Sequence, residues 1–298
     1  NFDGFTYGKG ASVLKQLPFY LGEENFRTGV SNYLKKFSYK NTDLDDFMGE
    51  LGKAADRDLS QWTQDWLYKA GLNSIRVDYQ CADSKISQLS IDQTAPEGFP
   101  TLREQRVQIG FYHISGGGLS RTGAVPVTYS GATTDVPEAV GMDCPDLLYP
   151  NEEDWGYVKV DLDKKSLAVA KQYINAVDSS MMRLMLWQSL IDSVSDANLS
   201  AETFVEFAMA NIPGETDYNV ARAIGGGLVK ALDYLSTATR LQIKDYSVTY
   251  AQVENLYLEL LSSAQAGSDL QKYWYSQYVD LSKNSMHLNN LRQILASE

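Results

Sequence analysis

The two histidines of the chain, His113 and His287, are the first candidates for metal chemistry. A catalytic zinc ion normally takes three protein ligands, and closely spaced histidines are usually among them. Neither histidine has another histidine four residues away, although a metal site needs several donors that converge. We therefore interpret both as surface or structural residues, and we expect no metal site in this chain.

Nucleophilic and carboxylate chemistry also find little support. A serine or cysteine nucleophile needs a nearby base, but His113 falls in a predicted strand, His287 lies near the C-terminus, and no nucleophile-elbow pattern occurs. Two acidic clusters have the composition of paired catalytic or metal-binding carboxylates. They are Asp43, Asp45 and Asp46, and Glu152, Glu153 and Asp154. We interpret the first as a solvated helix start and the second as a solvated loop.

Three other motifs favour structural roles. Residues 225–227 (GGG) fall inside a helical pattern, where they permit close helix packing, and they lack the preceding strand that a phosphate cradle requires. Residues 198–200 (NLS) match a glycosylation sequon, which we interpret as a helix N-cap. Cys81 and Cys144 form no Cys-x-x-Cys pair, so we interpret them as buried free thiols, with one bridge as the alternative in an oxidising compartment.

The composition defines the class of protein. With 298 residues, 44% hydrophobic and 21% charged, the chain has the make-up of a soluble globular protein of two or three domains. Its net charge of −12 and its lack of basic clusters argue against nucleic acid as a partner. No run of about 18 apolar residues exists, so we expect no membrane-spanning helix. We favour a cytoplasmic location and leave a periplasmic or secreted one open.

Helical and strand periods divide the chain into three segments. The first, 1–72, is helical, with Thr42 and Asp45 as a predicted N-cap and acidic first turn, and with a last helix that ends at Gly71. The second, 73–163, alternates with a period of two and predicts a small antiparallel β-sandwich. Its predicted strands lie near 75–79, 86–91, 107–111, 125–129 and 155–160, with a hairpin turn at 115–118.

The third segment, 164–298, returns to helical periods. Its predicted helices include 166–178, 180–195, 201–211, 217–236 and 249–264. Ser200 with Thr203 and Thr216 with Asn219 are the predicted caps. Paired helices of this kind bury their apolar faces in a solenoid-like stack or an irregular bundle.

The N-terminal segment closely resembles the aminopeptidase N family of zinc metallopeptidases, the gluzincins. The resemblance begins with residues 7–14 (YGKGASVL) and 21–27 (LGEENFR), and it continues through parts of 33–46, 58–67 and 70–73. A looser resemblance extends through 102–106, 109–112 and 149–160. It implies the helical second half of a thermolysin-like catalytic domain, then the β-sandwich, then the helical C-terminal domain that limits substrate size in this family.

The same resemblance assigns a catalytic role to Tyr7. In this family the tyrosine of the Tyr-x-Lys-Gly motif donates a hydrogen bond to the oxyanion of the tetrahedral intermediate. A phenol suits this role because it is a neutral donor at pH 7. Without the resemblance, Tyr7 is a tyrosine at a helix start, where packing is the usual role.

The zinc-binding elements of the family are absent from this sequence. Its Gly-x-Met-x-Asn loop, His-Glu-x-x-His helix and downstream glutamate ligand all precede the tyrosine motif. We therefore expect a C-terminal portion of a zinc aminopeptidase that acts on peptides with a free N-terminus, inactive without its missing N-terminal half. Its helices should then expose apolar residues such as Phe2, Phe5, Phe19 and Tyr20. The alternative is a non-catalytic module that binds a protein or peptide.

Overall fold

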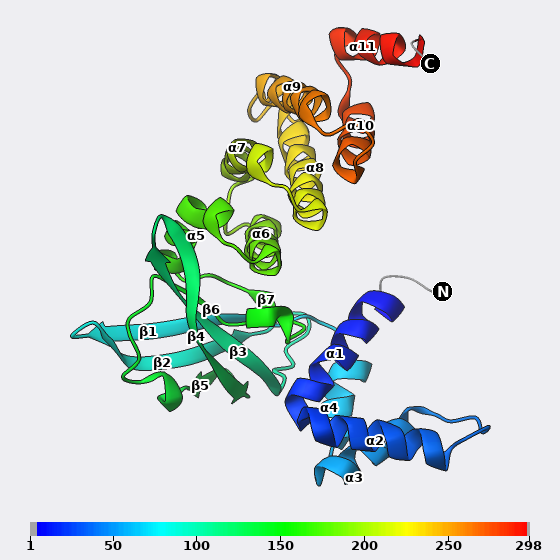
Figure 1. Cartoon of the computed structure of the whole chain (residues 1–298), viewed down its shortest axis with the longest axis vertical. Helices are drawn as coiled ribbons and strands as arrows, with labels where there is room; N and C mark the ends of the chain where they lie inside the picture. Colours follow the sequence, from blue (N-terminus) through cyan, green and yellow to red (C-terminus); the bar gives the residue numbers. More distant parts are fainter. Residues whose placement is uncertain (1–4, 297–298) are drawn as a thin grey trace. The chain divides into compact units, whose positions relative to one another are not determined.

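A computed structural model of the chain describes residues 5–296, with side chains from Tyr7 onward. The chain divides after Tyr173 into two compact units. The first contains the N-terminal helices, both sheets and helix α5 (Lys164–Tyr173), and the second contains the remaining helices (Figure 1). The predicted order of helices, sheets and helices is confirmed, and the three domain boundaries stay predictions.

The N-terminal helices bury one apolar face around Leu17, Leu51 and Trp66. These helices are η1 (Phe5–Lys9), α1 (Gly10–Leu21), α2 (Glu23–Lys36), α3 (Leu44–Ala55), α4 (Ser60–Thr63) and η2 (Gln64–Tyr68), where η1 and η2 are π-helices. The predicted cap of α3 was off by one residue. Asp43, not Thr42, is the N-cap, and it forms a capping box with Asp46.

The expected exposure of Phe19 and Tyr20 was wrong. Phe19 stacks on Trp155 with ring centroids 4.7 Å apart. Tyr20 is only 6% exposed, and its ring lies 4.2 Å from the Arg57 guanidinium. Both aromatic rings are therefore covered within the first unit, whereas Phe2 and the Phe5 side chain lie outside the described part of the structure.

The strands form two small sheets with alternate residues buried. The first sheet has the order β5 (Thr133–Asp135), β2 (Lys85–Thr94), β1 (Ser74–Ala82) and β7 (Lys159–Val160); the second has β4 (Gly118–Tyr129), β3 (Gln105–Ser115) and β6 (Leu147–Tyr149). All strand pairs are antiparallel except β1–β7. The loop before β6 joins the sheets, because the Cys144 N–H donates to Ser84 O and the Asp146 N–H donates to Tyr112 O, both at 2.9 Å.

The predicted last strand is shorter than expected. Only Lys159 and Val160 pair, while Trp155 lies in a closed loop. The Asn151 side chain closes that loop: it accepts from the Gly156 N–H at 2.7 Å and donates to Gly156 O at 2.9 Å. The loop, and not a strand, therefore sets the position of Trp155, which stacks on Phe19.

The two cysteines are not free thiols. Cys81 at the end of β1 and Cys144 in the loop before β6 form a disulfide, with their Cα atoms 6.0 Å apart. The Cys81 residue is exposed, so the prediction of buried thiols was wrong on both counts. The bridge was the alternative for an oxidising compartment.

The second unit is helical, as predicted. After the short η5 (Ile174–Ala176) its helices are α6 (Ser180–Ser195), α7 (Ala201–Asn211), η6 (Ile212–Gly214), α8 (Tyr218–Arg240), α9 (Ser247–Ser263), α10 (Asp269–Leu281) and α11 (Ser285–Ala296). Ser200 caps α7 through the Thr203 N–H, as expected. Asp217, not Thr216, caps α8.

The glycine run inside α8 does permit close packing. A Cβ atom at Gly225 would collide with the Tyr273 phenol, and one at Gly227 would lie 2.7 Å from atoms of Ile191 and Phe204. Gly226 faces open space. Two of the three glycines therefore let neighbouring helices approach the α8 backbone.

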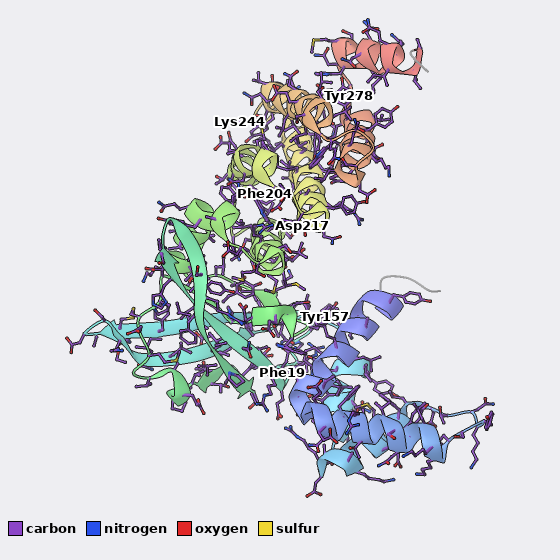
Figure 2. All side chains as sticks on the ribbon, in the orientation of Figure 1. Phe19, Tyr157, Phe204, Asp217, Lys244 and Tyr278 are labelled. Atoms are coloured by element: carbon purple, nitrogen blue, oxygen red, sulfur yellow. A yellow bond between two sulfur atoms is a disulfide. The ribbon has the colours of Figure 1, made fainter. Side chains whose placement is uncertain are left out.

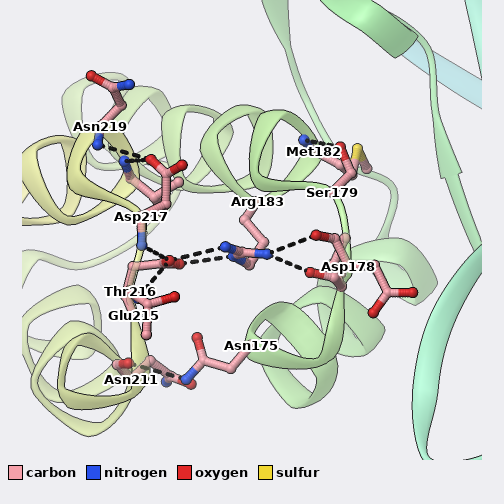
Figure 3. A network of polar contacts seen from close by, with 12 residues as sticks. Asn175, Asp178, Ser179, Met182, Arg183, Asn211, Glu215, Thr216, Asp217 and Asn219 are labelled. Carbon is pink, nitrogen blue, oxygen red and sulfur yellow. Dashed lines mark hydrogen bonds and ion pairs between the residues drawn. The ribbon is translucent and has the colours of Figure 1, made fainter.

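A buried ion pair fixes the start of the second unit (Figure 3). Arg183 on α6 makes a bidentate pair with Glu215, at 2.8 and 3.0 Å, and the Glu215 side chain is 2% exposed. Arg183 also donates to the carbonyl oxygens of Val177 and Asp178. The hydrogen bonds to Glu215 raise the pKa of Arg183. The pair connects α6 to the turn that enters α8.

We expect removal of the disulfide to destabilise the first unit. Replacing both Cys81 and Cys144 by serine should lower the free energy of unfolding by about 4 kcal/mol, because the bridge closes a loop between residues 63 positions apart. Urea denaturation under non-reducing conditions measures the change. A reductant should reproduce it in the unmodified chain and leave the double variant unaffected; equal midpoints for the chain with and without reductant would contradict the bridge.

We expect Arg183→Met to destabilise the second unit by about 3 kcal/mol, since it leaves the Glu215 carboxylate buried without its cation. The double variant Arg183→Met with Glu215→Leu should recover part of that loss, because it removes both charges. Thermal denaturation of the two variants measures the difference. Lys244→Met is the control, because its ion pair with Glu202 lies at the surface (Figure 2) and should change little. A double variant less stable than Arg183→Met would contradict the analysis.

Candidate functional site

Tyr7 lies in the π-helix η1, immediately before α1. Its side chain is 65% exposed. Short π-helical turns are rare and frequently occur at functional sites. A phenol in this position can donate a hydrogen bond to an oxygen that approaches from solvent. The structure thus presents the residue that the sequence identified, on a short irregular turn at the start of a buried helix.

Lys9 connects this turn to the second π-helix. Its Nζ donates to the carbonyl oxygen of Lys69, which directly follows η2, at 3.2 Å. Burial, and then the positive charge of Arg103, lower the pKa of Lys9. The two π-helices are therefore joined by one side chain of the Tyr-x-Lys-Gly motif.

Arg103 holds the acceptor of that bond in place. Arg103 is 1% exposed, and its side chain donates to four oxygens of η2 and of the segment that follows it. They are the carbonyl oxygens of Asp65, Lys69 and Ala70, at 2.8, 3.2 and 2.9 Å, and Asn73 Oδ1 at 2.6 Å. Its guanidinium lies 5.3 Å from the Trp66 ring, and its backbone N–H donates to Gln93 Oε1 at 2.9 Å. Burial lowers the pKa of Arg103.

A buried polar chain attaches the middle of α1 to the second sheet. Tyr129 donates its hydroxyl hydrogen to Gln105 Oε1, and Gln105 Nε2 donates to Gln16 Oε1, both at 2.5 Å. All three residues are at most 1% exposed. Because buried polar groups cost free energy unless they are paired, this chain specifies the position of α1 on the sheet.

A second attachment joins α1 to the loop after β6. Lys15 Nζ donates to the carbonyl oxygen of Asp154 at 2.7 Å and to its carboxylate at 3.0 Å. Phe19, which is labelled in Figure 2, lies one turn further along α1 and stacks on Trp155 of the same loop. The loop therefore contacts two successive turns of the helix that begins beside Tyr7.

The sequence analysis interpreted the acidic cluster of this loop as solvated, and for Glu152 that interpretation was wrong. Glu152 is 5% exposed and accepts a hydrogen bond from the Tyr112 hydroxyl at 2.7 Å. Arg121 lies 3.4 Å from Glu152 and 2.9 Å from Glu153. Burial raises the pKa of Glu152. Glu153 and Asp154 are exposed, and the Glu152 side chain fits because Gly110 has no Cβ in its way.

The other sequence candidates do not converge on Tyr7. Asp43 and Asp46 cap α3. His113 pairs with Thr122 on β4 at 2.7 Å, and the buried His287 pairs with Tyr278 in the second unit at 2.9 Å. A hollow of about 660 Å³ is lined by residues from Asp45 to Gln64, and Tyr7 is not among them.

The described residues do not fit a zinc ion. Between residues 5 and 296, no three side chains of His, Cys, Asp or Glu lie where they could share a metal. Over the same described range, no helix is both long and apolar enough to cross a membrane.

Comparison with known proteins identifies the family. Residues 147–297, about half of the chain, match the family model described as ERAP1-like C-terminal domain, and residues 1–66 match the Peptidase family M1 domain. Aminopeptidase N of Streptomyces lividans is 36% identical over 303 residues, which cover 99% of this chain and 35% of that protein. The chain belongs to the aminopeptidase N family. Tyr7, Lys9 and the helices that carry them lie within the M1 match.

Another relative matches a shorter part of the chain. Leucyl aminopeptidase of Saccharolobus solfataricus is 47% identical over 76 residues, which are 26% of this chain and 10% of that protein. A solved structure of Legionella pneumophila aminopeptidase A in complex with aspartic acid is 14% identical, with a TM-score of 0.43, and the match covers 94% of this chain and 35% of that one. This chain spans about a third or less of the length of these relatives.

The role of Tyr7 stays a prediction from the family resemblance. Arg103 appeared in the sequence analysis only within the looser resemblance of 102–106, without a role. An arginine next to a predicted strand usually lies at the surface. Arg103 is buried because it contacts the carbonyl oxygens at the end of η2. No periodic pattern in the sequence predicts that contact.

We expect Arg103→Met to lower the free energy of unfolding of the first unit by about 3 kcal/mol or more, because it strips hydrogen bonds from several oxygens at once. Urea denaturation measures the loss. Arg76→Met on β1 is the matched control, since the Arg76 side chain is 57% exposed and lies 3.8 Å from Asp92. Equal destabilisation by the two substitutions would contradict a central role for Arg103.

Proposed function

We propose that this chain forms part of a zinc-dependent aminopeptidase that removes N-terminal amino acids from peptides, and that Tyr7 is its oxyanion-stabilising residue. The observation that carries the proposal is the exposed Tyr7 phenol on a π-helix within the segment that matches the M1 domain. Family membership supports peptides with a free N-terminus as the substrate class.

The role of Tyr7 follows from the charge that develops in peptide hydrolysis. Attack of water on the scissile carbonyl turns its oxygen into an oxyanion, and a donor fixed at that position stabilises the transition state more than the ground state. A zinc ion in such an enzyme polarises the carbonyl and activates water. The described residues of this chain contribute only the phenol and the scaffold that fixes it.

We further propose that residues 1–298 alone do not hydrolyse peptides. The support is that the described residues lack a ligand set and that the chain spans 35% of its Streptomyces relative. The zinc ligands and the general base would then come from the other part of the whole protein. Activity of residues 1–298 with added zinc would favour a different catalytic arrangement.

The disulfide changes the preferred compartment. Bridges such as Cys81–Cys144 persist in oxidising surroundings and are rare where thioredoxin and glutathione keep thiols reduced. We therefore propose a periplasmic or secreted location in place of the cytoplasm. A thiol assay on protein purified from its natural source and then denatured without reductant tests this location, because two free thiols per chain would support the cytoplasm.

We expect Tyr7→Phe, made in the full gene product, to lower kcat by about 10²- to 10³-fold, as removal of one oxyanion donor does in other hydrolases. KM should change little because the ground-state carbonyl needs the donor less. Hydrolysis of an aminoacyl fluorogenic amide measures both constants.

Tyr39→Phe is the control for this test, since its fully exposed side chain lies in the turn after α2. It should retain the activity of the unmodified protein. Full activity of Tyr7→Phe would overturn the assigned role. A full gene product without aminopeptidase activity or bound zinc would instead favour the non-catalytic interaction module.

A further inference from the structure

Lys9 lies two residues after Tyr7 in the same π-turn. Lys9 stands between Gly8 and Gly10, and a Cβ atom at either glycine would meet nothing within 4 Å. Lys9 is also the N-cap residue of α1, and its side chain makes no capping hydrogen bond. Its Nζ instead crosses to Lys69 O at the end of η2. Lys9 therefore joins the turn that carries Tyr7 to the end of η2.

The acceptor at the other end of this bond is itself fixed. Lys69 O receives hydrogen bonds from both Lys9 Nζ and Arg103 Nη2, each at 3.2 Å. The Lys69 side chain is held by Asp65 Oδ1 at 2.6 Å. Because Arg103 is buried, its contacts leave this carbonyl little freedom to move. A tether to such a point restricts the turn more than a tether to an exposed loop.

We propose that Lys9 is a positioning residue for Tyr7: its ammonium, bound to Lys69 O, fixes the π-turn so that the Tyr7 phenol is held where the oxyanion forms. This inference rests on the proposed function of Tyr7. Displacement of a catalytic group by about 1 Å lowers the rate by up to about 10²-fold. One hydrogen bond that fixes the position of such a group is therefore enough to affect turnover.

A cation suits this place for a physical reason. Lys9 is partly buried and Arg103 is fully buried, and both ammonium and guanidinium donate to carbonyl oxygens from the end of η2, which solvate the two charges without cancelling them. Asp65, the nearby carboxylate, binds Lys69 and Gln61. Methionine at position 9 would keep the apolar stem and lose the hydrogen bond, whereas arginine would keep donors that can reach the same carbonyl.

The test compares Lys9→Met, Lys9→Arg, Tyr7→Phe and the double variant Lys9→Met with Tyr7→Phe in the full gene product. Lys9→Met should lower kcat about 10- to 100-fold with KM nearly unchanged, and Lys9→Arg should retain more of the activity than Lys9→Met. In the Tyr7→Phe background, Lys9→Met should add little further loss, because Lys9 acts through Tyr7. Lys35→Met, an exposed lysine on α2, is the control for charge removal.

A second readout does not depend on activity. Amide hydrogen exchange of residues 7–12 should become faster in Lys9→Met and stay unchanged in Lys35→Met, while exchange in the sheets is the same in both. Unchanged exchange, additive losses in the double variant, or a raised KM at constant kcat would each overturn the inference, the last of them in favour of a substrate contact. Full activity of Tyr7→Phe means that the proposed function has failed, whereas loss in Tyr7→Phe with full activity in Lys9→Met means that this inference alone has failed.

Discussion

The burial of Arg103 is the constraint on which the first unit depends. A guanidinium taken out of water must have its donors satisfied, and Arg103 finds oxygens at the end of η2 and at Asn73, just before β1. Those oxygens belong to the segment where the helical part passes into the sheets. The hydrogen bonds of Arg103 therefore fix the junction between the helical part and the sheets, and with it the orientation of one relative to the other. Glu104, the next residue, adds hydrogen bonds from Tyr20 and Arg57.

Helix α1 extends this constraint to Tyr7. Its middle is attached by the buried chain from Gln16 through Gln105, and its later turns are attached by Lys15 and Phe19 to the loop after β6. The Lys9 bond to Lys69 O acts near the exposed start of the helix. The helix is thus attached at several points away from solvent and, next to Tyr7, through the Lys9 bond.

The sequence predicted what depends on local pattern and missed what depends on long-range contacts. Alternation at Ile75 and Val77 predicted a strand, and helical spacing predicted α6, α7 and α8 within a few residues. The alternating pattern also predicted a strand at Trp155, but this residue lies in the loop that Asn151 closes on Gly156. Hydrogen bonds from the Asn151 side chain to the backbone replace strand pairing there.

The errors at the candidate site have the same origin. Tyr20 was expected to be exposed because the family resemblance implied a missing partner, yet Arg57 and Glu104 from the same unit cover it. Spacing left the pairing of Cys81 and Cys144 open, since they lie on elements that only the sheet topology brings together. Tyr7 was found through its motif and not through any physical pattern, because an exposed tyrosine at a helix start has no distinctive composition.

The two buried arginines show two ways of holding a cation, with different consequences. Arg183 is paired with the Glu215 carboxylate, and the hydrogen bonds of that pair raise the pKa of Arg183. Arg103 is solvated by carbonyl dipoles, so its charge is not cancelled by a direct ion pair, and burial lowers its pKa. That residual positive charge also contributes to the lowered pKa of Lys9. In a chain with a net charge of −12, Lys9 and Arg103 thus place two positive charges near the turn that carries Tyr7, which suits the oxyanion-stabilising role proposed for this phenol.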